Sequence, residues 1–419
     1  MNAYFVIILV AVLFEYALDV VANALNLRAM KPEMPAALQD VYKADEYRKS
    51  QEYTRATTRF GFVTGIFSLV LLLGFWFLGG FNFLDEVMRG WDFPIVVTGV
   101  LYIGILVLAY SVVSLPFSIY STFVIEERFG FNKTTPRTFV ADLLKGLALA
   151  AVLGVPVLAG ILAFFEYAGA LAWLYCWAAV TLFMLALEFV APTWIMPLFN
   201  KFTPLETGQL RDAIMEYARG VDFKVNNIFV IDGSKRSSKA NAFFTGFGRN
   251  KRIALFDTLI EKHTVSELVA VLAHEIGHYK KKHILQGIVV RVANTGAVFF
   301  LLSIVLGSTG LYDAFFMDEQ STYSGLLFFA LLYTPVNVVL SVVLNVVSRK
   351  HEYEADRWSA ETYEEPASLV ESLKKLSAEN LSNLDPHPFF VFLNYSHPPL
   401  LNRVEAIERR GKQEPALRN

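Results

Sequence analysis

Two histidines and a glutamate in the second half of the chain have the residue types and the spacing for metal chemistry. The segment His274-Glu275-Ile276-Gly277-His278 is an H-E-x-x-H motif. Residues four apart lie on one face of a helix, roughly 6 Å apart along its axis, so both imidazoles can bind one zinc ion. Glu275 would then point toward a water at that ion and act as its general base. The alternative is a surface helix with two unrelated histidines.

A catalytic zinc usually has three protein ligands, and segment 348–356 is the best source of the third. Glu352 would complete a His₂Glu site, and His351 and Glu354 compete with it for that place. Asp356, four residues after Glu352, could accept the outer N–H of a ligand histidine. We expect three further histidines at the surface or in packing contacts: His263, His283 and His387.

The composition indicates a membrane protein. Of the 419 residues, 54% are hydrophobic and only 18% are charged, against roughly 25% charged in soluble proteins. The mean hydropathy is +0.42. The net charge of −2 argues against a nucleic-acid binder. The single cysteine, Cys176, lies in an apolar run, so a disulfide framework and a thiolate metal site are both excluded.

Apolar runs of ~20 residues can span a bilayer. The sequence contains seven of them, at residues 4–27, 60–78, 94–117, 143–165, 168–194, 284–307 and 324–347. The first could instead be a signal peptide, because Ala22-Asn23-Ala24 resembles a cleavage site. It has no basic segment before it, however, and Glu15 and Asp19 lie inside it. We therefore expect seven uncleaved helices.

Several spans contain polar residues, which are costly against lipid and normally face a bundle interior. Glu15, Asp19 and Asn23 follow one another at intervals of four, which predicts a continuous polar stripe and a hydrated interior. Contacts between helices are the alternative explanation. The other polar residues within spans are Lys145, Glu188, Arg291, Asn294 and Asn337.

Lysine and arginine predict the orientation. Thirty-four of the 37 lie in segments 28–59, 118–142, 197–283 and 348–419, which seven helices place on one side. Only Arg89 lies on the other side. Because positive loops stay in the cytoplasm, we expect the zinc motif to be cytoplasmic and the N-terminus outside.

Four sections follow from these spans. Residues 1–199 hold the first five helices and their loops, and 284–347 hold helices six and seven. Residues 200–283 and 348–419 are too short to fold alone, so we expect one cytoplasmic α+β domain assembled from both.

Local patterns outline this domain. Residues 227–231, 241–247 and 252–256 are expected to be strands, the last two joined by a turn. The segment Thr264-Val265-Ser266-Glu267 is a capping box that starts the helix of the zinc motif. We expect that helix to continue through Lys280-Lys281-Lys282 into the sixth span, with the metal near the membrane surface.

Longer motifs give a resemblance to a known family. H-E-I-G-H followed by S-R-x-x-E-x-x-A-D resembles the membrane zinc proteases related to thermolysin. Four further stretches resemble the type I CAAX prenyl proteases specifically: residues 115–135, 195–205, 238–259 and 394–403. The resemblance covers essentially the whole chain.

This resemblance implies a mainly α membrane protein with seven helices around a large water-filled chamber. The zinc site lies at its cytoplasmic end, in an inner bacterial or endoplasmic reticulum membrane. It implies removal of the last three residues after a prenylated cysteine. It also marks a set of site residues: His274, His278 and Glu352 as zinc ligands, Glu275 as the base, Asn241 on a substrate-binding strand, and His397 as an oxyanion group.

The expected reaction is peptide hydrolysis at zinc, with extended substrate pairing along Asn241, Ala242 and Phe243. A plain structural hairpin is the alternative for that strand. Arg403 would pair either with a carboxylate behind the ligands or with the substrate carboxylate. A quality-control metalloprotease acting on unprenylated substrates is a second possible function. A seven-helix transporter or inactive scaffold is a third, which the full set of ligands and Glu275 argues against.

Overall fold

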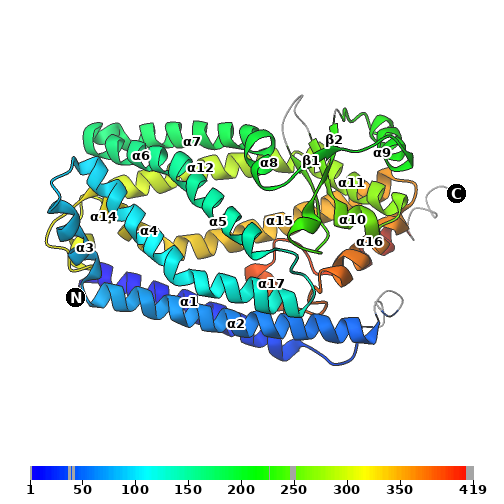
Figure 1. Ribbon diagram of the computed structural model, residues 1–419, viewed down its shortest axis with the longest axis horizontal. Coiled ribbons are helices and arrows are strands. Elements are labelled where there is room, and N and C mark those ends of the chain that lie inside the picture. The colour runs from blue at the N-terminus through cyan, green and yellow to red at the C-terminus, as the bar shows by residue number, and fades with distance from the viewer. Residues whose placement is uncertain (1, 36–38, 40–42, 226, 246–251, 412–419) are drawn as a thin grey trace.

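Long helices run the length of the molecule, and a small sheet with short helices lies at one end (Figure 1). The computed structural model describes residues 2–35, 39, 43–225, 227–245 and 252–411. The chain starts at the end opposite the sheet, where Asn2 Nδ2 donates to the carbonyl of Gly310 at 2.7 Å.

Six helices in the described residues are long and apolar enough to cross a membrane, and a bent pair makes a seventh. The seven predicted runs coincide with these spans, and none extends more than two residues beyond its span. Three spans consist of one α-helix each: α1 (Ala3–Ala29), α2 (Ala44–Phe77) and α12 (His283–Val305). Three more combine consecutive helical segments: α4 (Ile95–Tyr120) with η2 (Ser121–Glu126); α5 (Pro136–Leu149), η3 (Ala150–Gly154) and α6 (Val155–Tyr167); and η4 (Gly169–Leu171), α7 (Ala172–Val190), η5 (Ala191–Ile195) and α8 (Met196–Phe199). The bent pair is α14 (Thr322–Leu332) and α15 (Thr334–Thr362).

The seventh span bends by 51° between α14 and α15. Pro335 stands at the first turn of α15, where a proline fits because its missing N–H would have no helical partner there. After the bend, α15 continues beyond the predicted span to Thr362. One helix thus links the membrane to segment 348–356.

The first helix supports an open interior. Residues that follow one another at alternating intervals of four and three lie on one face of α1. This face has buried residues at both ends and exposed residues in the middle. Buried Ile8 and Val12 are followed by exposed Glu15 and Asp19, and then by buried residues again at Ala22 and Asn26. The opposite face is exposed and apolar, as lipid requires: Val6, Val10, Leu13 and Val21. The inner face therefore borders open space at mid-membrane, as expected for seven helices around a hydrated chamber.

Four of the other polar groups in the spans, Lys145, Glu188, Arg291 and Asn294, have partners from other segments. Arg291 Nη2 lies 3.2 Å from Glu188 Oε2, and Lys145 Nζ donates to the carbonyl of Leu198 at 2.7 Å. Tyr333 donates to Asn294 Oδ1 at 3.0 Å. Contacts between segments therefore account for these side chains, as the alternative explanation held.

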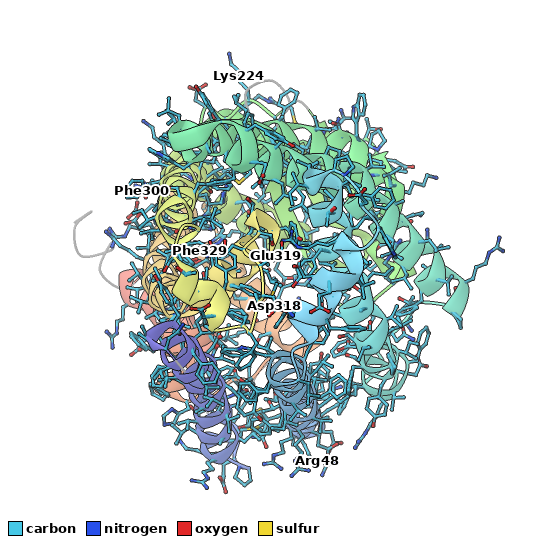
Figure 2. All side chains as sticks on the ribbon, turned by 90° about the vertical axis from the view of Figure 1, so that its left-hand side faces the viewer. Arg48, Lys224, Phe300, Asp318, Glu319 and Phe329 are labelled. Carbon is cyan, nitrogen blue, oxygen red and sulfur yellow. The ribbon has the colours of Figure 1, made fainter. Side chains whose placement is uncertain are left out.

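The end of the bundle away from the sheet is closed by two short helices, α3 (Gly80–Arg89) and α13 (Thr309–Asp313). Asp85, 2% exposed, accepts from Tyr323 and from Arg89 Nε at 2.8 Å, and Arg89 Nη1 is 2.9 Å from Glu319. Figure 2 looks onto this end, with Asp318 and Glu319 near its centre. An ion-pair network therefore ties α3 to the segment before α14.

The sheet has four strands in the order β1-β2-β4-β3. They are β1 (Phe202–Pro204), β2 (Asn227–Ile231), β3 (Ala242–Thr245) and β4 (Arg252–Phe256). β2 and β4 pair in parallel, and β1 and β3 pair antiparallel with them at the two edges. The strands predicted at 227–231 and 252–256 are confirmed. The strand predicted at 241–247 begins one residue later, and residues 246–247 lie outside the described part.

Short helices cover this sheet and complete the domain. They are α9 (Gln209–Gly220), η6 (Gly233–Lys235), α10 (Asp257–Lys262), α11 (Val265–Lys280), α16 (Pro366–Glu379), α17 (Pro388–Asn394) and α18 (Leu400–Gly411). Apolar residues of α9, α11 and the sheet form one buried core that includes Ile214, Leu255 and Leu272. After α16 the tail is helical except at residues 380–387 and 395–399.

The capping box is confirmed, but the continuous helix after it is wrong. Thr264 N donates to Glu267 Oε2 at 3.1 Å, and Glu267 N donates to Thr264 Oγ1 at 3.3 Å. The helix α11 then ends at Lys280. Lys282 adopts a left-handed conformation with φ 61°, and α12 begins anew at His283. A residue with positive φ cannot continue a right-handed helix, so the chain changes direction between the zinc motif and the sixth span.

Candidate active site

The helices α11 and α15 approach each other closely at the H-E-x-x-H motif. A Cβ added to Gly277 would lie 3.0 Å from Trp358 Cβ and 3.1 Å from Ala355 Cα. Ser359 Oγ also donates to the carbonyl of Ala270 at 2.9 Å. A Cβ at this position would push the two helices apart by a few tenths of an ångström, so glycine favours the approach that brings segment 348–356 against the motif.

Three donor atoms converge between these helices. Nε2 of His274 lies 3.1 Å from Nε2 of His278, and Glu352 Oε1 lies 3.3 Å from His278 Nε2. Glu352 Oε2 is 3.5 Å from His274 Nε2. Within the described residues, ligand atoms of these three side chains all lie within 4.8 Å of one another.

This donor set fits a metal cation. Two imidazole nitrogens and one carboxylate are ligands that zinc prefers. Glu352 is 4% exposed, and its buried Oε2 has no hydrogen-bond partner among the described residues. A buried anionic oxygen that accepts no hydrogen bond is costly, and a cation bound between the three side chains would remove that cost.

Asp356 lies behind His274 as predicted. Its Oδ1 is 2.9 Å from His274 Nδ1, and the side chain is 2% exposed. Arg403 from α18 donates to Asp356 through Nε at 2.8 Å and through Nη2 at 2.6 Å. Its Nη1 is 3.4 Å from Glu352 Oε2. Of the two partners considered for Arg403, the structure therefore supplies the carboxylate behind the ligands.

The carboxylates dominate the electrostatics of this side. Burial by itself lowers the pKa of His274, but hydrogen bonds to Asp356 and Glu352 outweigh it and raise the pKa to about 9. Burial also opposes the charge of Arg403, and Asp356 more than compensates, so the pKa of Arg403 is raised. The site is therefore built to stabilise positive charge.

His397 lies beside the three donor atoms, and Glu275 adjoins one of their residues in the chain. Glu275 is half-buried, next to His274 in α11. His397 Nε2 is 3.4 Å from Glu352 Oε1, and its side chain is 65% exposed. Its Nδ1 is 3.0 Å from Ser396 Oγ. An exposed imidazole at the rim of a buried donor set can reach an incoming substrate.

One histidine expected at the surface or in packing is instead part of this constellation. His283 is 6% exposed, and its Nδ1 lies 3.0 Å from Nδ1 of His278. The sequence signal for this contact would have been a helix break at Lys280-Lys281-Lys282, before His283. On a continuous helix, five residues place two side chains about 140° apart, so they do not meet. His263 contacts the carbonyl of Leu259 at 3.1 Å, and His387 accepts from Phe389 N at 3.2 Å, so both fit the packing prediction.

The predicted substrate strand lies at the edge of the sheet. β3 pairs with β4 on one side only, with Ala242 opposite Leu255 and Phe243 opposite Ala254. Asn241 is exposed and immediately precedes the strand, and its carbonyl accepts from Phe256 N at 3.1 Å. Within the described part of the chain, the other edge of β3 is unpaired.

A cleft of about 510 Å³ adjoins the site, between α16 and the segment before α18. His397 and Arg403 lie along it, together with Asn380, which directly follows α16. Asn380 also bonds both backbone groups of Ala240, at 3.1 and 3.2 Å, which fixes the start of the edge strand beside the cleft.

Comparison with known proteins places the chain in a family. Residues 23–201 match the family model described as the CAAX prenyl protease N-terminal region with five membrane helices. Residues 204–411 match the model of peptidase family M48.

Whole-chain similarity is also high. A CAAX prenyl protease 1 homologue of Arabidopsis thaliana is 36% identical, covering 97% of this chain and 96% of the relative. CAAX prenyl protease 1 of Saccharomyces cerevisiae is 35% identical over 90% of this chain and 88% of the relative.

A solved structure agrees with these similarities. The crystal structure of S. mikatae Ste24p superposes with a TM-score of 0.91 at 31% identity, covering 97% of this chain and all of that one. The fold, the donor set and the similarity along both chains agree. The chain therefore belongs to the CAAX prenyl protease 1 family of M48 peptidases and is a multi-pass membrane metalloprotease.

Proposed function

We propose that this protein is a zinc endopeptidase that removes the C-terminal tripeptide from substrates with a prenylated cysteine. The observation that carries the proposal is the set of donor atoms from His274, His278 and Glu352, which lie within 4.8 Å of one another beside Glu275. It stands in a chain that is similar over 97% of its length to a protein named as a CAAX prenyl protease 1 homologue.

A zinc ion held by His274, His278 and Glu352 would supply the chemistry that zinc supplies in hydrolases, which is to polarise the scissile carbonyl and activate water. Glu275 accepts the proton of the attacking water and transfers it to the leaving amine. His397 donates to the oxyanion, a role worth about 3–4 kcal/mol for such donors. Asp356 holds the Nδ1 proton of His274, and Arg403 keeps Asp356 ionised.

The substrate binds in two parts. The peptide adds to the free edge of β3 along Asn241, Ala242 and Phe243, where strand addition supplies backbone hydrogen bonds without regard to side chains. The isoprenoid lies against the helices that border the bundle interior. This arrangement accounts for a catalytic centre attached to a bundle whose inner face is open around Glu15 and Asp19.

A pair of matched peptides tests the substrate class. One carries a farnesyl thioether on the cysteine before the scissile bond, and the other carries the free thiol. We expect kcat/KM to favour the farnesylated peptide, chiefly through KM, because burial of a lipid chain contributes about 0.8 kcal/mol per CH₂.

The quality-control function predicts the opposite result for this pair. Equal kcat/KM, or faster cleavage of the bare peptide, would rule out prenyl dependence and support a protease for unprenylated membrane proteins. The Glu275→Gln protein is the control for contaminating proteases, since it should cleave neither peptide. A transporter or scaffold would cleave neither peptide even as the unaltered protein.

We also propose that the zinc domain faces the cytoplasm, since 34 of the 37 lysines and arginines lie in segments on its side of the bundle. The test uses protein lacking Cys176 and carrying one new cysteine, at Asn2 or at Asn419. A membrane-impermeant thiol reagent added to intact cells should label the first variant and spare the second. Labelling of the second variant from outside contradicts this orientation.

A further inference from the structure

The imidazole of His283 lies between a proposed zinc ligand and the protein surface. Its Nδ1 is 3.0 Å from Nδ1 of His278, and its Nε2 is 3.0 Å from Oε2 of Glu354. The His283 side chain is 5% exposed, whereas that of Glu354 is 35% exposed. Side chains from α11, α12 and α15 thus form a chain of polar groups from the site to solvent.

The ligand geometry decides which nitrogen of His278 carries its proton. Nε2 of His278 faces the other donors, 3.1 Å from His274 Nε2 and 3.3 Å from Glu352 Oε1. A ligating imidazole is neutral, so its proton lies on the second nitrogen, Nδ1. That N–H points at His283 Nδ1, which must accept it, and Nε2 of His283 then donates to Glu354.

We propose that His283 is a positioning residue for His278. By accepting at Nδ1, it fixes the ring orientation of His278 and presents the Nε2 lone pair to the metal. Glu354 in turn fixes the tautomer of His283. The inference rests on the proposed zinc site and adds to it a role for two residues that touch neither metal nor substrate.

The chain turn after α11 makes this arrangement possible. Lys282 has φ 61°, and the turn there brings His283 against His278 of α11. His351 stacks on the His283 ring with centroids 3.9 Å apart and planes at 9°. It is anchored by its own contact, since its Nε2 is 2.9 Å from Gln286 Oε1. Because His351 covers the ring face, its replacement alters packing without removing either hydrogen bond of His283.

Two substitutions separate the two hydrogen bonds. The amide oxygen of asparagine can occupy the region of Nδ1, and the amide of the longer glutamine reaches the region of Nε2. His283→Asn therefore keeps an acceptor for His278, and His283→Gln keeps a donor for Glu354 only. The measurements use the purified full-length protein: the rate of zinc release to a chelator, and the visible spectrum after substitution with Co(II).

We expect His283→Gln to release zinc about 10–100-fold faster and to change the Co(II) spectrum, as loss of an outer partner typically does. His283→Asn should remain closer to the unaltered protein, and His351→Phe should not accelerate release. Glu354→Gln alters a partly exposed residue that folding tolerates, and it should give a smaller acceleration in the same direction.

Three outcomes overturn the proposal. They are equal release rates for the Asn and Gln variants, equal acceleration by His351→Phe, and unchanged release in both His283→Gln and Glu354→Gln. The zinc content of the unaltered protein keeps this test separate from the proposed function. No bound zinc there contradicts the catalytic site itself, whereas normal zinc content with unchanged variants contradicts only the role of His283.

Discussion

The two imidazoles at the centre of the site have different neighbours. His274 contacts a buried carboxylate directly, with Asp356 Oδ1 at 2.9 Å and Arg403 paired to that carboxylate. His278 instead faces another imidazole, His283, and a carboxylate enters only one step later, at Glu354 near the surface. A buried charge must be paired, so the buried carboxylate of Asp356 behind His274 requires an arginine. The carboxylate of Glu354 on the His278 side is partly solvated and has no such requirement.

The two proposed ligand histidines are therefore supported by different kinds of side chain, a charged pair behind His274 and a neutral imidazole behind His278. The charged side stabilises a cation strongly, and it depends on a residue from α18, far along the chain. The neutral side orients a ring at lower electrostatic cost and uses residues on α12 and α15. We therefore expect damage to the charged side to have the larger effect on metal affinity.

The largest effect is expected where both sides meet, at Glu352. Glu352→Gln should lose bound zinc and activity together, because the ligand carboxylate becomes a weak neutral amide. Glu354→Gln is the matched control and should keep zinc at equilibrium. Metal analysis of the purified proteins beside peptide cleavage decides this. Retention of zinc by Glu352→Gln with loss in Glu354→Gln would reverse the ligand assignment.

Glu275→Gln should impair catalysis without affecting metal binding on either side of the site. We expect kcat/KM to fall about 10²–10⁴-fold, the usual contribution of a general base, with zinc content unchanged. The measurement pairs steady-state kinetics with metal content in one preparation. Joint loss of zinc and activity would assign Glu275 a ligand or structural role, together with the residues of the charged side.

The smallest effect concerns the charged side alone. Asp356→Asn should weaken zinc binding about 10–100-fold, as is typical of partners behind ligands. Arg403→Lys should have a smaller effect, since a charge still faces Asp356 although the two parallel hydrogen bonds are lost. Chelator competition gives both values. A weaker effect for Asp356→Asn than for His283→Gln would show that the neutral side is the stronger support.

Much of this molecule could be predicted from local sequence. The seven spans follow from the length of apolar runs, and the capping box at Thr264 and Glu267 follows from two residues three apart. The pairing of His274 with His278 follows from helical spacing alone. Each signal involves residues within one turn or one element, where geometry is set by the backbone.

The third ligand shows where local reasoning ends. Spacing gave Glu352 only a modest preference over Glu354 and His351, and the resemblance to a family decided for Glu352. In the structure, Glu352 faces the two histidines. Glu354, two residues and about 200° around the helix, contacts His283 instead. The rotation of α15 against α11 decided this, and the close approach at Gly277 fixes that rotation.

Local sequence determined which side chains could do chemistry and the elements that carry them: the H-E-x-x-H helix, the strands and the membrane spans. Tertiary structure decided which of these side chains meet. Arg403 reaches Asp356, 47 residues away along the chain, because α18 packs behind α15, and His283 reaches His278 because the helix breaks at Lys282. The physical reason is the distance along the chain over which each kind of interaction acts. Periodicity and capping are properties of a few neighbouring residues, whereas contacts between distant segments depend on how whole helices pack.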